Sequence, residues 1–418
     1  MEPTGPMETG PTAPARGRSS SQQAFPHLGR LVSPDAIQEF LANSFGQDAY
    51  LRRLPEAEAS PLFSWDLLNR AIAEHRLGPP RLKLEKGGAE VGRAVFRERR
   101  PRPNQVLHDI DVPALYEHLR DGATLILDAV NELHAPLRQL SSGLATEFCA
   151  TSQTNLYACW GQSQGFEVHW DDHDVFVVQV AGSKQWDLYG FSHASPLRRE
   201  PQPAQMPTSS PEQIVLQAGD MLYLPRGYWH AARGRDEPSL HLTIGLSRKS
   251  GADFLHWLAN EAVVEAAVRA DLRLEQDDVA LGEQLADLLS RLTELDTPAD
   301  LGRRYRRHLQ ARRTHRPELS LPHIGLAEAP FAARSRLRLT EGVSSLTQGD
   351  DPPSVMLTHR GTVYTLAPEL SAVMSSLRAG EAPTFGQMLG RCTAPAPLVE
   401  AFVKDMLQRG VLAIETGE

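Results

Sequence analysis

The stretch Gly165-Phe-Glu-Val-His-Trp-Asp-Asp-His-Asp-Val-Phe-Val-Val-Gln-Val-Ala-Gly182 decides how the centre of this chain is interpreted. It places His169 and Asp171 two residues apart, shortly before an apolar, β-branched run from Val175 to Val180. Because side chains on an extended strand alternate between its two faces, His169 and Asp171 are expected to point the same way. The pair is therefore a candidate for two ligands of one metal ion.

A second stretch, from Gly219 to His230, offers the third ligand. It contains an apolar run at Met221 to Leu224, a Pro-Arg-Gly turn, and then His230. Two imidazoles and one carboxylate occupy three positions of Fe(II) and leave three neighbouring ones open for a bidentate co-substrate and dioxygen. A lone His-x-Asp pair is common at solvated strand ends, so the metal hypothesis depends on this second stretch.

The second stretch also resembles a known signature of the cupin superfamily, which reads Gly, five residues, Pro-x-Gly, two residues, His. The residues that fit it are Gly219, Pro225, Gly227 and His230. The first cupin signature is fitted only in part. Asp171 stands where cupins commonly carry a second His, and Val175 and Phe176 stand at the positions of their Glu.

This departure is typical of the JmjC branch. The segments "SQGFEVHWDDHDVFVVQVAGSKQWDLY", "GDMLYLPRGYWHAA" and "SLHLTIGL" resemble the ribosomal oxygenases, JmjC enzymes that hydroxylate ribosomal proteins with Fe(II), 2-oxoglutarate and dioxygen. The resemblance implies that His169, Asp171 and His230 bind the iron. It also implies a protein substrate, with a ribosomal protein as the first candidate.

The same resemblance implies a co-substrate pocket. Lys184, fifteen residues after His169, matches the family's basic residue, whose charge-assisted bond holds the distal carboxylate of 2-oxoglutarate. Asn155 and Tyr157 in "TNLYACWG" match a strand of that pocket, and Thr243 matches a threonine that lines it. The alternative for Lys184 is a solvated hairpin residue.

Two departures from the family concern the target. Gly245 stands where the family often has serine, a residue that contacts the substrate in some members, and Ala158-Cys159-Trp160 replaces a "TPP" segment. The same chemistry on a ribosomally made peptide or a small metabolite therefore stays open as an alternative.

The distribution of apolar residues predicts an α+β protein with several parts. Residues 1–24 contain almost no large apolar side chain and are expected to be disordered. Residues 25–250 are expected to form the catalytic domain, with N-terminal helices before a double-stranded β-helix, the cupin and JmjC jelly roll. Residues 251–320 follow as a helical region, and 333–418 as a winged helix.

Three further segments carry hypotheses about partners. Ser192 to Gln213 contains five prolines and is expected to be a surface excursion at the barrel mouth. The Arg-rich segment 303–316 is expected to be a solvated face, with an acidic or RNA-rich target as the alternative. Leucines at helical spacing in 252–312 pair two subunits in the resembling family, which implies a homodimer; intrachain packing is the alternative.

A DNA-binding regulator with a sensory cupin is a separate hypothesis. Residues 350–418 carry five Lys or Arg against eight Asp or Glu, whereas a DNA-reading module normally presents a basic face. DNA binding is therefore disfavoured.

The whole-chain composition fits a globular protein. Hydrophobic residues make up 41% and charged residues 23%, and the net charge of -9 argues against a protein that coats nucleic acid. The three cysteines fit no zinc pattern, and no signal peptide or apolar run of membrane-spanning length is present. We expect a cytoplasmic location without membrane attachment.

Overall fold

The computed structural model describes residues 24–53, 62–162, 165–193, 195–197, 206–294, 297–312, 318–320, 332–340, 343–350, 353–360, 362–378 and 382–415. Nearly all of the tail expected to be disordered, and parts of the 192–213 and 303–316 segments, lie outside these residues. The chain divides into two compact units, residues 1–248 and 249–418.

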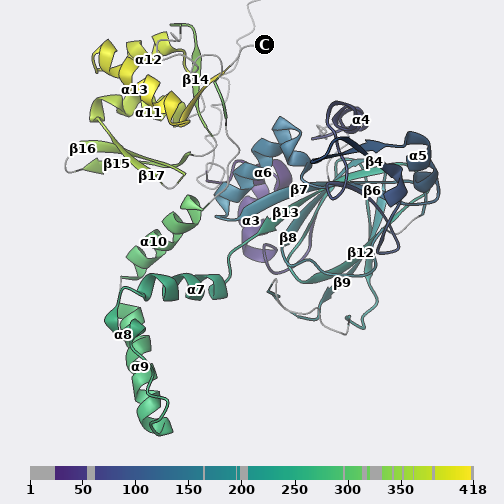
Figure 1. Cartoon of the computed structure of the whole chain (residues 1–418), viewed down its shortest axis with the longest axis horizontal. Helices are drawn as coiled ribbons and strands as arrows, with labels where there is room; N and C mark the ends of the chain where they lie inside the picture. The colour runs from purple at the N-terminus through teal and green to yellow at the C-terminus, as the bar shows by residue number, and fades with distance from the viewer. Residues whose placement is uncertain are drawn as a thin grey trace, which may run out of the picture. The chain divides into compact units, whose positions relative to one another are not determined.

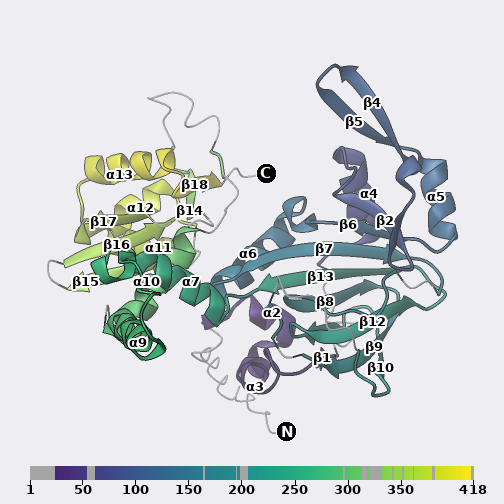
Figure 2. The ribbon, with the colours of Figure 1, turned by 60° about the horizontal axis from the view of Figure 1, so that its bottom comes forward.

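The first unit is built on two antiparallel sheets that face each other, consistent with a jelly roll (Figure 1, Figure 2). The larger sheet has the spatial order β1 (Tyr50–Arg52), β11 (Met221–Leu224), β8 (Asp174–Ala181), β13 (Ser239–Ser247), β7 (Thr151–Cys159), β6 (Thr124–Leu127), β2 (Leu82–Lys86), β3 (Ala89–Val91). The smaller sheet has the order β10 (Glu212–Leu216), β9 (Lys184–Phe191), β12 (Tyr228–Gly234).

Helices cover the outer face of the larger sheet. Their bounds are α2 (Leu28–Val32), η1 (Pro34–Ala36), α3 (Ile37–Asn43), α4 (Trp65–Glu74), η2 (Arg93–Val95), α5 (Val112–Arg120), η3 (Val130–Glu132) and α6 (Ala135–Glu147). One core cluster joins Phe40 of α3 and Leu140 of α6 to Phe176, Tyr223 and Ile244 of the sheet. A hairpin of β4 (Phe96–Arg102) and β5 (Gln105–Ile110) projects from this unit (Figure 2).

The central strand β13 separates the core from the space between the sheets. Leu240, Leu242, Ile244 and Leu246 are all fully buried, as expected for the face that packs on the helices. The alternate residues of β13 face the opposite way, because strand side chains alternate with a period of two. The inner face therefore carries His241, Thr243, Gly245 and Ser247.

The segment from Gly165 to His173 differs from the expected strand. His169 forms an isolated β-bridge to His230 of the smaller sheet. Regular strand pairing begins only at Asp174, the first residue of β8 in the larger sheet. The chain changes sheets between these two points, so it cannot complete a regular ladder. The side chains of His169 and Asp171 reach one site as predicted, but the segment that carries them is not a regular strand.

The second unit combines helices with two small sheets. Its elements are α7 (Gly251–Ala262), α8 (Ala266–Arg269), α9 (Asp278–Glu294), α10 (Pro298–Ala311), β14 (Arg336–Leu339), β15 (Val343–Asp350), β16 (Pro353–His359), β17 (Thr362–Leu366), η4 (Pro368–Leu370), α11 (Ser371–Arg378), α12 (Phe385–Arg391), α13 (Ala396–Gln408) and β18 (Leu412–Glu415). β14 pairs with β18, and β15, β16 and β17 form a three-stranded sheet.

The helices of the second unit differ in how many of their side chains are buried. Residues from β14 to β18 share one hydrophobic core that includes Leu357, Val373 and Val403. By contrast, none of residues 278–292 of α9 is buried, and its Leu289 is 63% exposed. None of the helices in the described ranges has the length and apolar content required to cross a membrane.

A buried carboxylate ties together the start of β8 and the end of the first unit. Asp174 is 1% exposed and accepts hydrogen bonds from the Tyr223 hydroxyl (3.2 Å), the Arg226 backbone N–H (3.0 Å) and the Arg248 guanidinium. The Arg248 guanidinium in turn lies over the Phe45 ring, 4.3 Å from its centroid. Asp174 is buried while the Arg248 side chain is 36% exposed, so loss of the carboxylate is costly mainly because three donors lose their acceptor in and beside the core.

We expect Asp174→Ala to lower the free energy of unfolding by about 3 kcal/mol. Denaturant unfolding monitored by tryptophan fluorescence would measure this free energy, because five of the six tryptophans lie in the 1–248 unit. Asp121→Ala is the matched control, since the Asp121 carboxylate pairs with Lys86 on the surface. Equal stability of the two variants would contradict the assigned role of Asp174.

Candidate metal and co-substrate site

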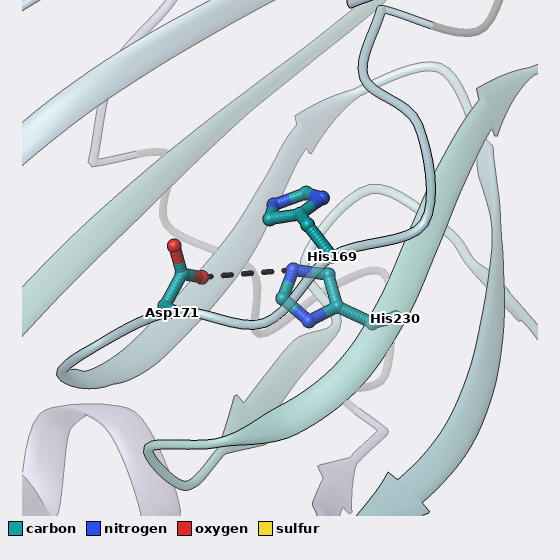
Figure 3. Close-up of side chains that lie close together, drawn as sticks. All are labelled: His169, Asp171 and His230. Atoms are coloured by element: carbon teal, nitrogen blue, oxygen red, sulfur yellow. Dashed lines mark ion pairs between the residues drawn. The ribbon is translucent and has the colours of Figure 1, made fainter. Parts of the chain in front are cut away.

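His169, Asp171 and His230 converge at one end of the space between the two sheets (Figure 3). One ligand atom from each residue lies within 4.8 Å of the other two, and the Asp171 Oδ2 to His230 Nε2 distance is 3.6 Å. The structure therefore brings together the three residues that the sequence predicted as ligands.

Backbone bonds hold this arrangement in place. The N–H of His169 donates to the carbonyl of His230 (3.0 Å), and the N–H of His230 donates to the carbonyl of His169 (2.8 Å). The N–H of Gly227 donates to the carbonyl of Asp171 (2.9 Å), and Gly227 has a φ of +86°, which favours glycine. The three ligands are thus fixed by main-chain contacts rather than by their side chains alone.

Both imidazoles are oriented by their Nδ1 atoms. Nδ1 of His169 lies 2.8 Å from the Glu167 carbonyl, and Nδ1 of His230 lies 2.9 Å from the Tyr228 carbonyl. A carbonyl oxygen only accepts, so each Nδ1 carries the proton and each Nε2 keeps a lone pair for a metal. Burial lowers the pKa of His230 to about 4, although the charge of Asp171 acts in the opposite direction. The low pKa keeps this imidazole neutral, as a metal ligand must be.

A cavity of about 560 Å³ extends from the triad along the inner face of the larger sheet. Cross-strand pairs of β7 and β13 line it in sequence: Tyr157 with His241, Asn155 with Thr243, Gln153 with Gly245, and Thr151 with Ser247. His241 is buried, whereas Thr151 and Ser247 are exposed. The ladder therefore runs from a closed inner end to an open mouth.

Lys184 lies at the inner end of this cavity. It is 4% exposed, which excludes the alternative of a solvated hairpin residue, and burial lowers its pKa despite a hydrogen bond with Cys159. Among the described residues, no carboxylate lies within ion-pair distance of its ammonium group. A buried ammonium without a counter-charge is unfavourable, so this end of the cavity favours an anion.

Two neighbouring polar atoms also lack partners. Nδ1 of His241 and Nε1 of Trp186 are buried without a hydrogen-bond partner in the described structure. The His241 ring stacks on Tyr157 with centroids 4.9 Å apart, and its pKa is well below the ordinary value because of burial and the nearby charge of Lys184. An anion beside Lys184 is thus within reach of further groups that need partners.

Asn155 and Tyr157 are held in position in the cavity wall. The Asn155 side-chain oxygen accepts from the backbone N–H of Ala129 (3.0 Å) and from Nε2 of Gln153 (2.8 Å), and Tyr157 lies two residues along the same strand, on the same face. Burial and the Asp171 charge raise the pKa of Tyr157, so it remains a neutral donor. All four residues predicted for the co-substrate pocket, Lys184, Asn155, Tyr157 and Thr243, line the cavity.

The sequence did not single out His241, Trp186, Gln153 or His173, which also line the cavity. The signal that could have found two of them, Gln153 and His241, is alternation: odd-numbered positions in 151–157 and 241–247 face inward. The donor set as a whole fits the cofactors that the sequence implied. Three N and O ligands leave an Fe(II) coordination sphere open, and the lysine end fits a dicarboxylate.

Comparison with known proteins supports a JmjC fold for this part of the chain. Residues 132–254 match the family described as "JmjC domain". The "Bifunctional lysine-specific demethylase and histidyl-hydroxylase NO66" of Dictyostelium discoideum is 29% identical over 224 residues, which cover 52% of this chain and 42% of that protein. "Ribosomal oxygenase 1" of Gallus gallus is 33% identical over 172 residues, 40% of this chain and 28% of that protein.

Solved structures with the same fold include YcfD, a ribosomal oxygenase from Escherichia coli, in complex with cobalt and 2-oxoglutarate. It has a TM-score of 0.54 and 16% identity, and the match covers 91% of this chain and 98% of that one. At this identity the likeness is one of fold. The chain spans less than half the length of the curated relatives described above.

We expect the purified chain to bind one divalent metal ion, with Co(II) as the probe, and Asp171→Ala to reduce the affinity at least about 100-fold, because the variant loses the charged ligand. Visible absorption of Co(II) or calorimetry would measure the binding. Glu167→Ala is the control, since only its backbone carbonyl contacts His169. Undiminished binding in Asp171→Ala would remove the metal assignment.

Proposed function

We propose that this chain, which carries a JmjC domain at residues 132–254, is an Fe(II)- and 2-oxoglutarate-dependent dioxygenase that hydroxylates a side chain of a ribosomal protein. The observation that carries the proposal is that a three-residue candidate metal site shares one cavity with a buried lysine that has no carboxylate in ion-pair distance among the described residues. The names of the relatives support the choice of a ribosomal protein as target.

In this proposal His169, Asp171 and His230 hold the iron. Iron bound there would supply the oxidation of 2-oxoglutarate to succinate and CO₂, coupled to insertion of one oxygen atom of dioxygen into a C–H bond of the target. Lys184 would hold the distal carboxylate, and Tyr157, His241 and Trp186 would surround it with donors and apolar surface. Burial of this end would keep water away from the co-substrate.

Two alternatives differ in target or class. The same chemistry on a ribosomally made peptide or small metabolite would use the same inner residues, so only the mouth distinguishes it. A cupin-type transcription regulator is disfavoured by the acidic balance of 350–418, which would repel DNA phosphates.

The proposal also assigns roles to the domains of the chain, including those of the second unit. We assign residues 25–250 to the catalytic domain, 251–320 to a helical dimerisation region and 333–418 to a winged helix that does not read DNA. The exposed leucines of α9 support a homodimer, because such an apolar surface needs a partner. Light scattering tests this, and a monomer would contradict it. We place the protein in the cytoplasm, where its three free cysteines stay reduced.

The function is tested in two steps. The purified chain with Fe(II), 2-oxoglutarate and ascorbate should form succinate slowly in air without a target, with ascorbate supplying the two electrons that reduce the second oxygen atom to water. Mass spectrometry of ribosomal proteins from cells with and without the gene should then find one protein that gains a single oxygen atom only when the gene is present. Absence of succinate from metal-loaded protein would refute the enzyme assignment; succinate without a modified ribosomal protein would favour the alternative targets.

We expect Lys184→Ala to raise the 2-oxoglutarate concentration needed for half-maximal succinate formation by about 10- to 100-fold, the range of a charge-assisted hydrogen bond. Co(II) binding should be retained, because Lys184 contacts the co-substrate and not the ligands. Lys86→Ala, which removes a surface lysine, is the control. An unchanged requirement in Lys184→Ala would leave the lysine with a structural role only.

A further inference from the structure

The projecting hairpin of the first unit is separate from the cavity. Its strands β4 and β5 extend beyond α4 and α5 (Figure 2), and none of the described residues 96–110 lines the cavity. Residues 97–106, ten in succession, are all exposed. This stretch, the hairpin tip, is therefore accessible to a partner.

The base of the hairpin is anchored to the first unit. Phe96 is 9% exposed and belongs to a core cluster against which Ile110 packs. The N–H of Asp111 donates to the carbonyl of Val95 (2.9 Å). A two-stranded hairpin is only marginally stable by itself in water, so these contacts at the base hold the ribbon in place.

The hairpin tip has a charge opposite to that of the whole chain. It contains four arginines, no lysine and one acidic residue, Glu98, and so carries a net charge of +3. The full chain has a net charge of -9. The tip is therefore a local positive surface on an acidic protein.

The arginines of the hairpin tip are held only by surface contacts. Three ion pairs are present: Arg97 with Asp111, Arg99 with Asp109 at 2.8 Å, and Arg100 with Glu98 at 3.3 Å. The three arginine side chains in these pairs are between 54% and 73% exposed. Among the described residues, Arg102 has no ion-pair partner. Exposed ion pairs contribute little to stability, so these guanidinium groups are available to another anion.

The backbone distributes the arginines over the ribbon. Arg97 and Arg99 lie on the same face, roughly 7 Å apart along the strand, which is close to the separation of neighbouring phosphates on one nucleic-acid strand. The pairing register shifts between Arg99 and Arg102, so a bulge lies between them. A bulge bends and twists a strand, and the guanidinium groups are therefore not confined to one side of the ribbon.

The composition of the hairpin tip favours a nucleic acid over a protein as the partner. A stable protein interface needs an apolar or aromatic centre, whereas Val106 is the one large apolar side chain of the tip. Charge of either sign would protect exposed strand edges, so edge protection does not explain the arginines. Arginine binds phosphate through two parallel hydrogen bonds and stacks on bases, which lysine does not.

We propose that the hairpin tip, residues 97–106, binds RNA at an unpaired loop or bulge, with guanidinium groups on the phosphates and against the exposed bases. Paired RNA keeps its base edges in a groove too narrow for side chains, whereas unpaired bases can stack on arginine. The choice of RNA rests on the proposed function, because a ribosomal protein lies beside RNA in the ribosome. The binding itself does not involve the cavity.

The test measures fluorescence anisotropy of labelled probes with the full-length chain. The probes are a stem-loop RNA with an unpaired bulge, a fully paired RNA, a DNA stem-loop of the same sequence and polyglutamate. At low salt the bulged RNA should bind with a Kd of about 10 µM or tighter, and each other probe at least about threefold more weakly. Absence of binding to the bulged RNA, or equal or tighter binding of the DNA or of polyglutamate, would overturn the proposal.

Variants assign the binding to the hairpin tip. One variant removes its four positive charges: Arg97→Gln, Arg99→Gln, Arg100→Gln and Arg102→Gln. It should lose at least about tenfold in RNA affinity, and the slope of log affinity against log salt should become shallower by about 2 to 3, because each phosphate contact with a single strand contributes about 0.7. Its melting temperature should stay close to the wild-type value, since the lost ion pairs are exposed.

The matched control changes the net charge by the same amount elsewhere. It replaces four exposed arginines of α10: Arg303→Gln, Arg304→Gln, Arg306→Gln and Arg307→Gln. This control should keep most of the RNA affinity. An equal loss in both variants would show that only net charge matters and would overturn the proposal, as would wild-type affinity in the hairpin variant.

Succinate formation separates this proposal from the proposed function. The hairpin variant should form succinate as the wild type does, because the hairpin tip does not line the cavity. A wild-type chain that forms succinate but does not bind the bulged RNA would defeat the RNA proposal alone. A chain that binds the RNA through the hairpin tip but forms no succinate would defeat the proposed function instead.

Discussion

The structure depends on the register of one strand, β13, which pairs with β7 on one edge and β8 on the other. Its even-numbered residues fill the core beneath the helices, and its odd-numbered residues form the cavity wall. A slip of one residue would exchange the two sets and place His241 in the core and leucines in the cavity. Stability and chemistry are therefore constrained together.

The candidate site buries polar groups at a cost in free energy that the apolar core beneath it does not carry. Within the described part of the chain, Lys184 is buried with no carboxylate in ion-pair distance, and His241 and Trp186 bury polar atoms that have no hydrogen-bond partner. A buried polar group without a partner is unfavourable, and a bound anion would offset that free-energy cost. Under the proposed function, binding of 2-oxoglutarate should consequently stabilise the first unit.

The sequence predicted this candidate ligand set because the His-x-Asp pair and the segment before His230 are chemically distinctive, and the structure brings His169, Asp171 and His230 together. The segment that carries His169 and Asp171 is nevertheless not a regular strand, since it lies where the chain passes between the sheets. His241 and Gln153 escaped notice for another reason. A single histidine in an apolar strand looks like a core residue, and its true face depends on pairing with a strand far away in the sequence.

The exposure gradient along the β7 and β13 ladder also constrains the order of events. Lys184 and His241 lie at the closed end, whereas Gln153 and Ser247 lie at the mouth. Under the proposed function, a target side chain at this mouth would stand across the path to Lys184. The co-substrate would then enter before the target, and succinate would leave after it. Residues at the mouth can therefore change with the target while the inner residues keep the same chemistry.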